Sequence, residues 1–161
     1  VALDLRSAGG RAALADLLRT ADVVVEASRP RALATMGLSF THLHAGGWRG
    51  VWLSITGHGT QGDQAARVAF GDDGAAAGGL VVPGDEGTPL FCADAIADPA
   101  TGLLGATAIL RALADGVSGH LGVSLANTAA HLAAGVRDNP AVSTAPDLVV
   151  AAPVARTGGS R

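Results

Sequence analysis

The sequence predicts an α/β fold, a parallel sheet with flanking helices, for this chain of 161 residues. Apolar stretches typical of buried strands alternate with stretches that carry apolar residues at helical spacing, and this order favours parallel strands joined by crossover helices. Three consecutive valines, Val23 to Val25, are typical of a strand that is covered on both faces. The aromatic content of 3% and the 23 glycines indicate closely packed helices and tight turns.

The first half of the chain predicts three strands with helices between them. Apolar side chains that indicate strands cluster at residues 1–5, 21–26 and 50–56. Ser7 is placed to cap a helix, whose expected apolar face consists of Leu14, Leu17 and Leu18. Pro30 suits the first turn of a second helix, which Gly37 would end. We therefore expect a strand, helix, strand, helix, strand order.

A polar segment rich in glycine, residues 57–71, follows the third predicted strand. Open α/β sheets bind ligands at the carboxyl ends of their strands, so this loop is placed where a site is expected. The next segment predicts a helix or turn of small residues that Gly78 and Gly79 would end. Residues 83–89 carry the glycines and prolines typical of a turn.

The last third predicts one long helix and a further strand and helix pair. Asp98 and Pro99 resemble the cap and first residue of a helix that runs to about Asp115. Residues 120–135 predict a strand followed by a helix. The remaining segment, 136–161, contains three prolines and a glycine-rich end, so we expect a linker or tail that is poorly ordered.

Composition excludes several classes of protein. The net charge of −3 and the lack of basic clusters argue against a nucleic-acid partner. No apolar run of about 18 residues and no basic leader followed by an apolar run are present, so we expect no membrane span and a cytoplasmic location. Cys92, the single cysteine, cannot form an internal disulfide, and we expect it in the core. The chain starts at Val1, inside a predicted strand, which suggests a piece of a longer protein.

The loop after the third strand contains a formal G-x-G-x-x-G pattern at Gly57, Gly59 and Gly62. A dinucleotide site also needs a helix that begins at the third glycine and an acidic residue at the end of the next strand. The sequence supplies neither. The alternative is a flexible loop whose glycines allow a ligand to approach the backbone closely.

The order of motifs resembles that of class III CoA-transferases, the family that includes formyl-CoA and carnitine-type CoA-transferases and the related methylacyl-CoA racemases. The matching stretches are "LDLRSAGGRAALADLLRTADVVVEASRPRALATMGLSFTHL", "VWLSITGHGTQG", "AFGDDGAAAGGL", "ADPATGLLGATAILRAL" and "GHLGVSLANTAAHL". The resemblance implies a Rossmann-like sheet that is incomplete here, because the family's N-terminal strand and second domain have no counterpart. Residues 1–135 would then be part of the CoA-binding catalytic domain.

The resemblance places the family's nucleophile, an aspartate that attacks the acyl-CoA thioester, on Asp98 within D-x-x-T-G. Covalent catalysis by a carboxylate is chemically sound there, since a helix N-terminus favours negative charge. Spacing alone supports a plain helix cap equally well. Asp94 is expected to be an exposed loop acid, and Asp72 and Asp73 to lie in a turn or helix start. His42 and His44 are expected at the surface of a short helix, so no metal site is predicted.

The same resemblance implies the residues that contact CoA. They are Leu3, Arg6, Ala27, Ser28, Arg29, Pro30, Gly57, Gly59 and Phe70. Two of them depart from the family: Ala27 and Ser28 replace the usual Asn-Phe pair, which predicts weaker or altered CoA binding. Phe70 stands where racemases have a histidine, and this favours transfer over racemisation, which needs an acid and a base on opposite faces of the α-carbon.

The implied partners are an acyl-CoA and a carboxylic acid, with CoA thioester as substrate and no permanently bound cofactor. The resemblance also implies a homodimer for the full-length protein. Three other hypotheses stay open: a degenerate domain that binds CoA weakly or only packs on a partner, an acyl-CoA racemase, and a nicotinamide-dependent oxidoreductase.

Overall fold

The structure, a computed structural model, describes residues 1–29, 32–136 and 149–150. Its main sheet has the strand order β1-β2-β5-β6. The strands are β1 (Val23–Glu26), β2 (Val51–Thr56), β5 (Gly119–Ser124) and β6 (Val149–Val150). β1, β2 and β5 are parallel, and β6 pairs with β5 in the antiparallel direction. The predicted α/β class with a parallel sheet is confirmed.

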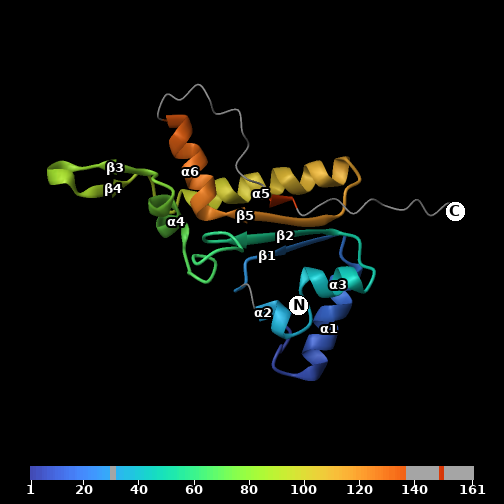
Figure 1. Ribbon diagram of the computed structural model, residues 1–161. Helices are drawn as coiled ribbons and strands as arrows, with labels where there is room; N and C mark the ends of the chain where they lie inside the picture. Colours follow the sequence, from blue (N-terminus) through green and yellow to red (C-terminus); the bar gives the residue numbers. More distant parts are fainter. Residues whose placement is uncertain (30–31, 137–148, 151–161) are drawn as a thin grey trace.

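Helices cover both sides of this sheet (Figure 1). One group consists of α1 (Ala8–Thr20), α2 (Ala32–Thr35) and α3 (Phe40–Ala45). The other consists of α5 (Ala97–Ala114) and α6 (Leu125–Val136). A short helix, α4 (Gly71–Ala77), leads into a projecting hairpin of β3 (Val81–Pro83) and β4 (Pro89–Phe91), with a 3-10 turn at Asp85–Gly87 between them.

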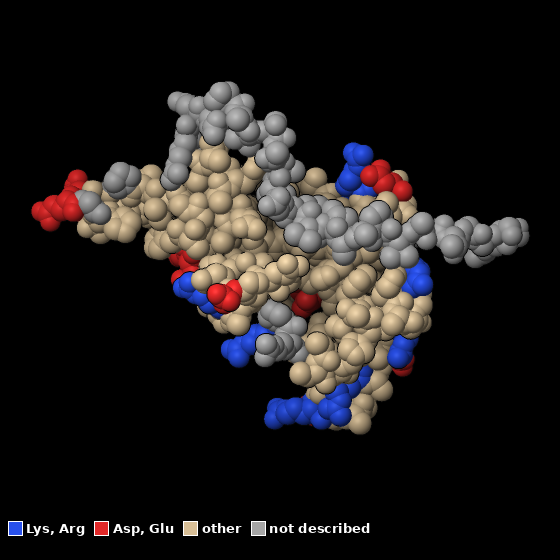
Figure 2. Space-filling view, viewed as in Figure 1, with Lys and Arg blue, Asp and Glu red and all other residues tan. Residues whose placement is uncertain are grey.

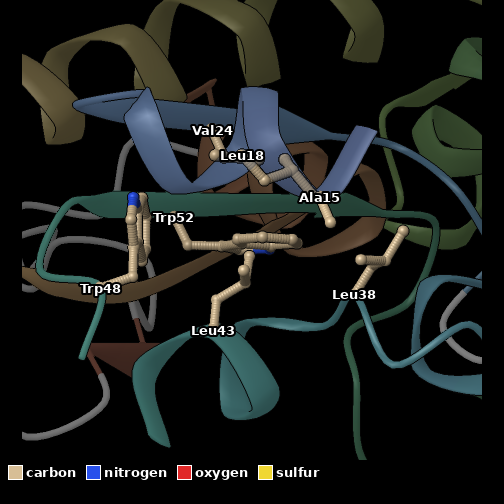
Figure 3. Close-up of a cluster of buried hydrophobic side chains, with 7 residues drawn as sticks. All are labelled: Ala15, Leu18, Val24, Leu38, Leu43, Trp48 and Trp52. Carbon is tan, nitrogen blue, oxygen red and sulfur yellow. The ribbon is translucent and has the colours of Figure 1, made fainter. Parts of the chain in front are cut away.

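The alternation of side chains along the strands gives each face of the sheet its own core. On the face toward α1 and α3, Trp52 packs with Val24, and in Figure 3 Leu18 of α1 and Leu43 of α3 point toward its indole ring. Trp52 is 2% exposed, so this ring is at the centre of that layer. Burial of a large aromatic side chain is among the larger single contributions to a core.

The opposite face of the sheet packs against α5. Its buried residues are Val51, Leu53, Leu121 and Val123. Gly105 lets the helix approach closely, because a Cβ atom built there would lie 2.8 Å from Cδ2 of Leu53. The long helix is therefore fixed directly on β2 and β5, and its first turn lies at the edge of the sheet where these strands end.

Small residues form a third cluster that joins α4, α6 and the start of α5. Its buried members are Ala75, Leu80, Ala97, Leu125, Ala129 and Ala133. Gly74 contributes to the close approach, since a Cβ atom there would lie 2.5 Å from Cβ of Leu125. This packing fixes the relative positions of the first turns of α4 and α5.

Several predicted boundaries are confirmed. The Oγ atom of Ser7 accepts a hydrogen bond from the amide of Gly10 at the start of α1. Gly37 and Gly79 have φ angles of +71° and +77°, as expected of glycines that end helices. Helix α5 ends at Ala114, next to the expected limit at Asp115.

Other expectations about local structure are wrong. Residues 1–5 form no strand; this segment instead turns into α1, and the amide of Ser7 bonds to the carbonyl of Asp4. Leu17 is 49% exposed, because the buried stripe of α1 runs through Ala15 and Leu18. The turn expected at 83–89 is present, as the tip of the β3-β4 hairpin, but the two strands beside it were not predicted, because with three residues each they are too short to show alternation. Cys92 is exposed, directly after β4, and is not a core residue.

The predicted tail at 136–161 lies almost entirely outside the described residues (undescribed residues are grey in Figure 2), so the proposed boundary between a domain and a tail stays a prediction. Within the described residues, no helix is both long enough and apolar enough to cross a bilayer.

Candidate active site

The candidate site lies where the parallel strands end. β1 leads into Ala27 to Arg29, β2 into the glycine-rich loop, and β5 into α6. The loop is attached at its beginning: Oγ1 of Thr56 accepts the amide of Gly59 at 2.9 Å, and the carbonyl of Gly57 accepts the amide of Ala126 at 3.0 Å. Three segments that are distant in sequence thus meet at one edge of the sheet.

Gly57 is also in contact with the end of its own loop. A Cβ atom at Gly57 would lie 2.8 Å from Cβ of Ala69, which leaves no room for a side chain. Phe70, the next residue, is 72% exposed, and α4 begins immediately after it at Gly71. Gly62 is followed by a turn rather than by a helix, so the loop differs from a dinucleotide-binding loop.

Asp98 lies in the first turn of α5, against Gly71. The helix begins at Ala97 with Ile96 at the N-cap, so Asp98 is not the cap residue that the sequence suggested. The reason is that the turn before it already has helical backbone angles at Ile96 (φ −57°, ψ −27°). A Cβ atom at Gly71 would lie 2.7 Å from Oδ2 of Asp98, so the carboxylate lies directly over this glycine, and the residue is exposed.

The other acidic residues of this region have structural partners or face solvent. Oδ1 of Asp72 accepts the amide of Ala95 at 2.8 Å, and Oδ2 of Asp73 accepts the amide of Phe70 at 3.1 Å. Both residues are in the first turn of α4, as expected, although Asp72 is half-buried. Asp94 is exposed, which confirms its prediction.

The residues that the resemblance assigned to CoA lie in three segments of the chain. Gly57, Gly59 and Phe70 lie in the glycine-rich loop, which leads into α4 at Gly71, the residue over which the Asp98 carboxylate lies. Ala27, Ser28 and Arg29 follow β1 at the same edge of the sheet, and Pro30 lies outside the described residues. Leu3 and Arg6 precede α1. The Arg6 side chain is 98% exposed, with Asp4 3.7 Å away, so it is available to a phosphate but is not held in place.

A buried polar cluster lies beneath the segment that follows β1. Oγ of Ser54 donates to Oε1 of Glu26 at 2.8 Å, accepts from Nε1 of Trp52 at 3.1 Å, and lies 2.9 Å from Nε2 of His120. The serine hydroxyl has one hydrogen, which Glu26 receives, so His120 must donate from Nε2. We call these four residues, Glu26, Trp52, Ser54 and His120, the Ser54 cluster.

The Ser54 cluster extends to the predicted CoA segment. The amide and the hydroxyl of Ser28 both donate to Oε2 of Glu26. Phe40 of α3 stacks on the His120 ring, with 5.1 Å between ring centroids. Burial lowers the pKa of His120, and the nearby carboxylate of Glu26 opposes this effect. The histidine is therefore held in its neutral form more firmly than a free imidazole.

Sequence analysis did not anticipate the Ser54 cluster. A signal was present, since Glu26, Ser54 and His120 are polar residues in or next to predicted buried strands, where a polar side chain needs a partner. Which of them share a face depends on register: β1 pairs Glu26 with Ser54, and β5 pairs His120 with Trp52.

Within the part of the chain that the structure describes, His42 and His44 belong to no group of metal-ligating side chains. Both lie in the short helix α3, where the Ser39 hydroxyl is 2.8 Å from Nδ1 of His42 and His44 stacks on Phe40. Among the residues that the structure describes, no group of three or more His, Cys, Asp or Glu side chains is arranged to hold a metal ion.

The fold and the site together define an α/β domain with a loop and an accessible carboxylate at the carboxyl edge of a parallel sheet. Residues 1–143 match the family described as CoA-transferase family III, so the chain belongs to this family. Its members transfer coenzyme A and use CoA thioesters as substrates. The resemblance read from the motifs is confirmed.

Two curated relatives support the same assignment. The chain is 32% identical to an acyl-CoA transferase of Fusarium pseudograminearum over 115 residues, which cover 70% of this chain and 25% of that protein. It is 28% identical to a succinate–glutarate CoA-transferase of Agrobacterium fabrum over 154 residues, which cover 92% of this chain and 38% of that protein. The chain thus spans well under half of either relative.

Solved structures show the same fold. A hypothetical protein from Mycobacterium tuberculosis superimposes with a TM-score of 0.78 and 29% identity, over 85% of this chain and 40% of that one. A CaiB/BaiF family protein from Brucella suis gives a TM-score of 0.72 and 28% identity, over 83% of this chain and 37% of that one.

Proposed function

We propose that this chain is the central part of the CoA domain of a class III CoA-transferase, with Asp98 as the nucleophile. The single observation that carries the proposal is the place of its carboxylate, exposed in the first turn of α5 and lying over Gly71 at the end of the glycine-rich loop. The substrates are an acyl-CoA and a carboxylic acid. As in the family, the full-length protein is expected to act as a homodimer.

The reaction proceeds through covalent intermediates on Asp98. An oxygen of the Asp98 carboxylate attacks the thioester carbonyl carbon, the C–S bond breaks, and CoA leaves as the thiolate, which gives a mixed anhydride. The thiolate then attacks the aspartyl carbonyl, which releases the donor acid and forms an aspartyl-CoA thioester. The acceptor carboxylate attacks this thioester, which breaks its C–S bond, expels the CoA thiolate and forms a second mixed anhydride. The thiolate then attacks the acceptor's acyl carbon in this anhydride, which gives the new acyl-CoA and regenerates the Asp98 carboxylate.

The chain supplies two features that suit this chemistry. The N-terminus of the 18-residue helix α5 gives positive potential beside the negative charge that the carboxylate carries and that develops at each tetrahedral step. Gly71 has no side chain, which lets Ala95 and the Asp98 carboxylate pack directly against the start of α4. Phe70 next to it gives no base for racemisation, so transfer is favoured.

Trapping of the intermediate tests the proposal. The protein is incubated with an acyl-CoA, treated with hydroxylamine and digested, and the modified residue is located by mass spectrometry. We expect a hydroxamate at Asp98, and none there in Asp98→Asn, while calorimetry shows that this variant still binds CoA. An adduct on a different carboxylate would refute the assignment of Asp98.

A second candidate is a noncatalytic domain that binds CoA weakly or packs on a partner. It is favoured by Ser28, whose amide and hydroxyl are both engaged by Glu26 and so are turned toward the protein. Calorimetry with CoA separates the two candidates, since a CoA-transferase domain gives saturable heat, whereas the noncatalytic domain gives weak heat without saturation, or none.

A further inference from the structure

Ala95 has a backbone conformation that residues with a side chain rarely adopt. Its φ angle is +46°, and among the described residues Glu86 in the hairpin turn is the other non-glycine residue with positive φ. This left-handed conformation is unfavourable for an alanine and persists where neighbouring groups hold it in place. Ala95 is three residues before Asp98, directly at the entry to α5.

Asp72 is the side chain that holds this turn. Its Oδ1 accepts the Ala95 amide at 2.8 Å, across 23 residues of sequence, in a partly buried position. The Ala95 carbonyl in turn accepts the amide of Asp98 at 2.9 Å. A continuous path of two hydrogen bonds therefore connects the Asp72 carboxylate with the backbone of Asp98.

The element that carries Asp72 is itself firmly fixed. Gly71, Gly74 and Ala75 of α4 are buried, and Gly74 packs on Leu125 of α6. Asp73, the adjacent acid, bonds only within its own helix start, to the Phe70 amide. Of the two acids, Asp72 is therefore the one whose side chain links α4 by a hydrogen bond to the turn before α5.

We propose that Asp72 is a positioning residue for the reaction: its bond to Ala95 fixes the turn that places the Asp98 carboxylate over Gly71. The effect on catalysis rests on the proposed function of Asp98. Displacement of a reacting group by about 1 Å costs on the order of 100-fold in rate, so loss of this bond is expected to slow acylation rather than to unfold the protein.

Four variants test this proposal through the initial rate of aspartyl-hydroxamate formation at Asp98. Asp72→Ala is expected to slow the rate about 10- to 100-fold. Asp72→Asn keeps an oxygen acceptor and is expected to stay near the wild-type rate. Asp72→Ala combined with Ala95→Gly should recover part of the loss, because glycine adopts positive φ without strain. Asp94→Ala removes an exposed charge beside Ala95 and serves as the matched control.

Amide exchange provides the second readout, measured by NMR for Ala95 and Asp98. Asp72→Ala should accelerate exchange of both amides, while Asp94→Ala leaves them unchanged. If Asp72→Ala forms the hydroxamate at the wild-type rate while Asp98→Asn forms none, the positioning role of Asp72 is overturned. The proposed function of Asp98 is not affected by that result. If the wild type forms no adduct at Asp98, the proposed function fails. Amide exchange then still tests the structural part: unchanged exchange of the Ala95 and Asp98 amides in Asp72→Ala would show that Asp72 does not hold this turn.

Discussion

Ser54→Ala is the most informative test of the structure, because one hydroxyl joins all members of the Ser54 cluster. Ser54 is 4% exposed and Trp52 is 2% exposed, so water cannot replace the lost oxygen at the indole N–H. Leaving one buried polar group without a partner costs about 1–3 kcal/mol. Glu26 keeps its hydrogen bonds from Ser28, and His120 is half-buried and so has access to water; the loss of Ser54 therefore costs little at these two residues. We expect Ser54→Ala to lower the free energy of unfolding by about 2–3 kcal/mol in total.

Urea denaturation followed by circular dichroism measures this change. A loss of about 2–3 kcal/mol corresponds to a fall in Tm of about 4–12 °C for a chain of this size. Thr107→Ala is the control, since its hydroxyl bonds to the Leu103 carbonyl at an exposed site and its loss should change stability by less than about 0.5 kcal/mol.

A double-mutant cycle identifies the responsible contact. Trp52→Phe removes the indole N–H, so Ser54→Ala should cost at least about 1 kcal/mol less in that background. An equal cost of Ser54→Ala in both backgrounds would refute the reasoning, because the orphaned N–H would then not be the source of the effect.

Two further predictions concern the same sheet. Because the pKa of folded His120 is lowered, the unfolded chain takes up a proton first as pH falls below about 6.5. The free energy of unfolding is therefore full above that pH and declines below it. His120→Gln should reduce this decline in denaturation series across pH 5–8, and an unchanged dependence on pH would contradict the prediction. Gly105→Val should destabilise the protein by about 1–3 kcal/mol, because the new side chain would overlap with Leu53. Gly102→Ala has open space at its Cβ and should stabilise the helix by about 0.5–1 kcal/mol. Unchanged stability in Gly105→Val would show that α5 lies less closely on β2.

The strands and long helices could be predicted because their signals are local. The valines of β1, the apolar run of β2 and the helical spacing in α5 each specify an element without information about distant residues. The errors have two sources. The strands of the β3-β4 hairpin have three residues each, which is too short for a periodic signal. Residues 1–5 have the apolar composition of a strand but form none, so composition alone is not sufficient there.

The candidate site was predicted only in part. Asp98 and the glycine-rich loop were named as candidates from motif order, but the positioning role proposed for Asp72 rests on a hydrogen bond that spans 23 residues. The Ser54 cluster likewise depends on strand register, which decides that Glu26 lies beside Ser54. No local pattern specifies such a pair.

The sequence by itself determined the α/β class, the membership in CoA-transferase family III and the glycines at which the main chain turns. Only the tertiary structure decided that a carboxylate from α5 lies over the first residue of α4, and that a serine, a histidine and a glutamate from three strands share one hydroxyl. The physical reason is that propensity and periodicity act over a few residues, whereas a site is made by packing and hydrogen bonds between elements that are far apart along the chain.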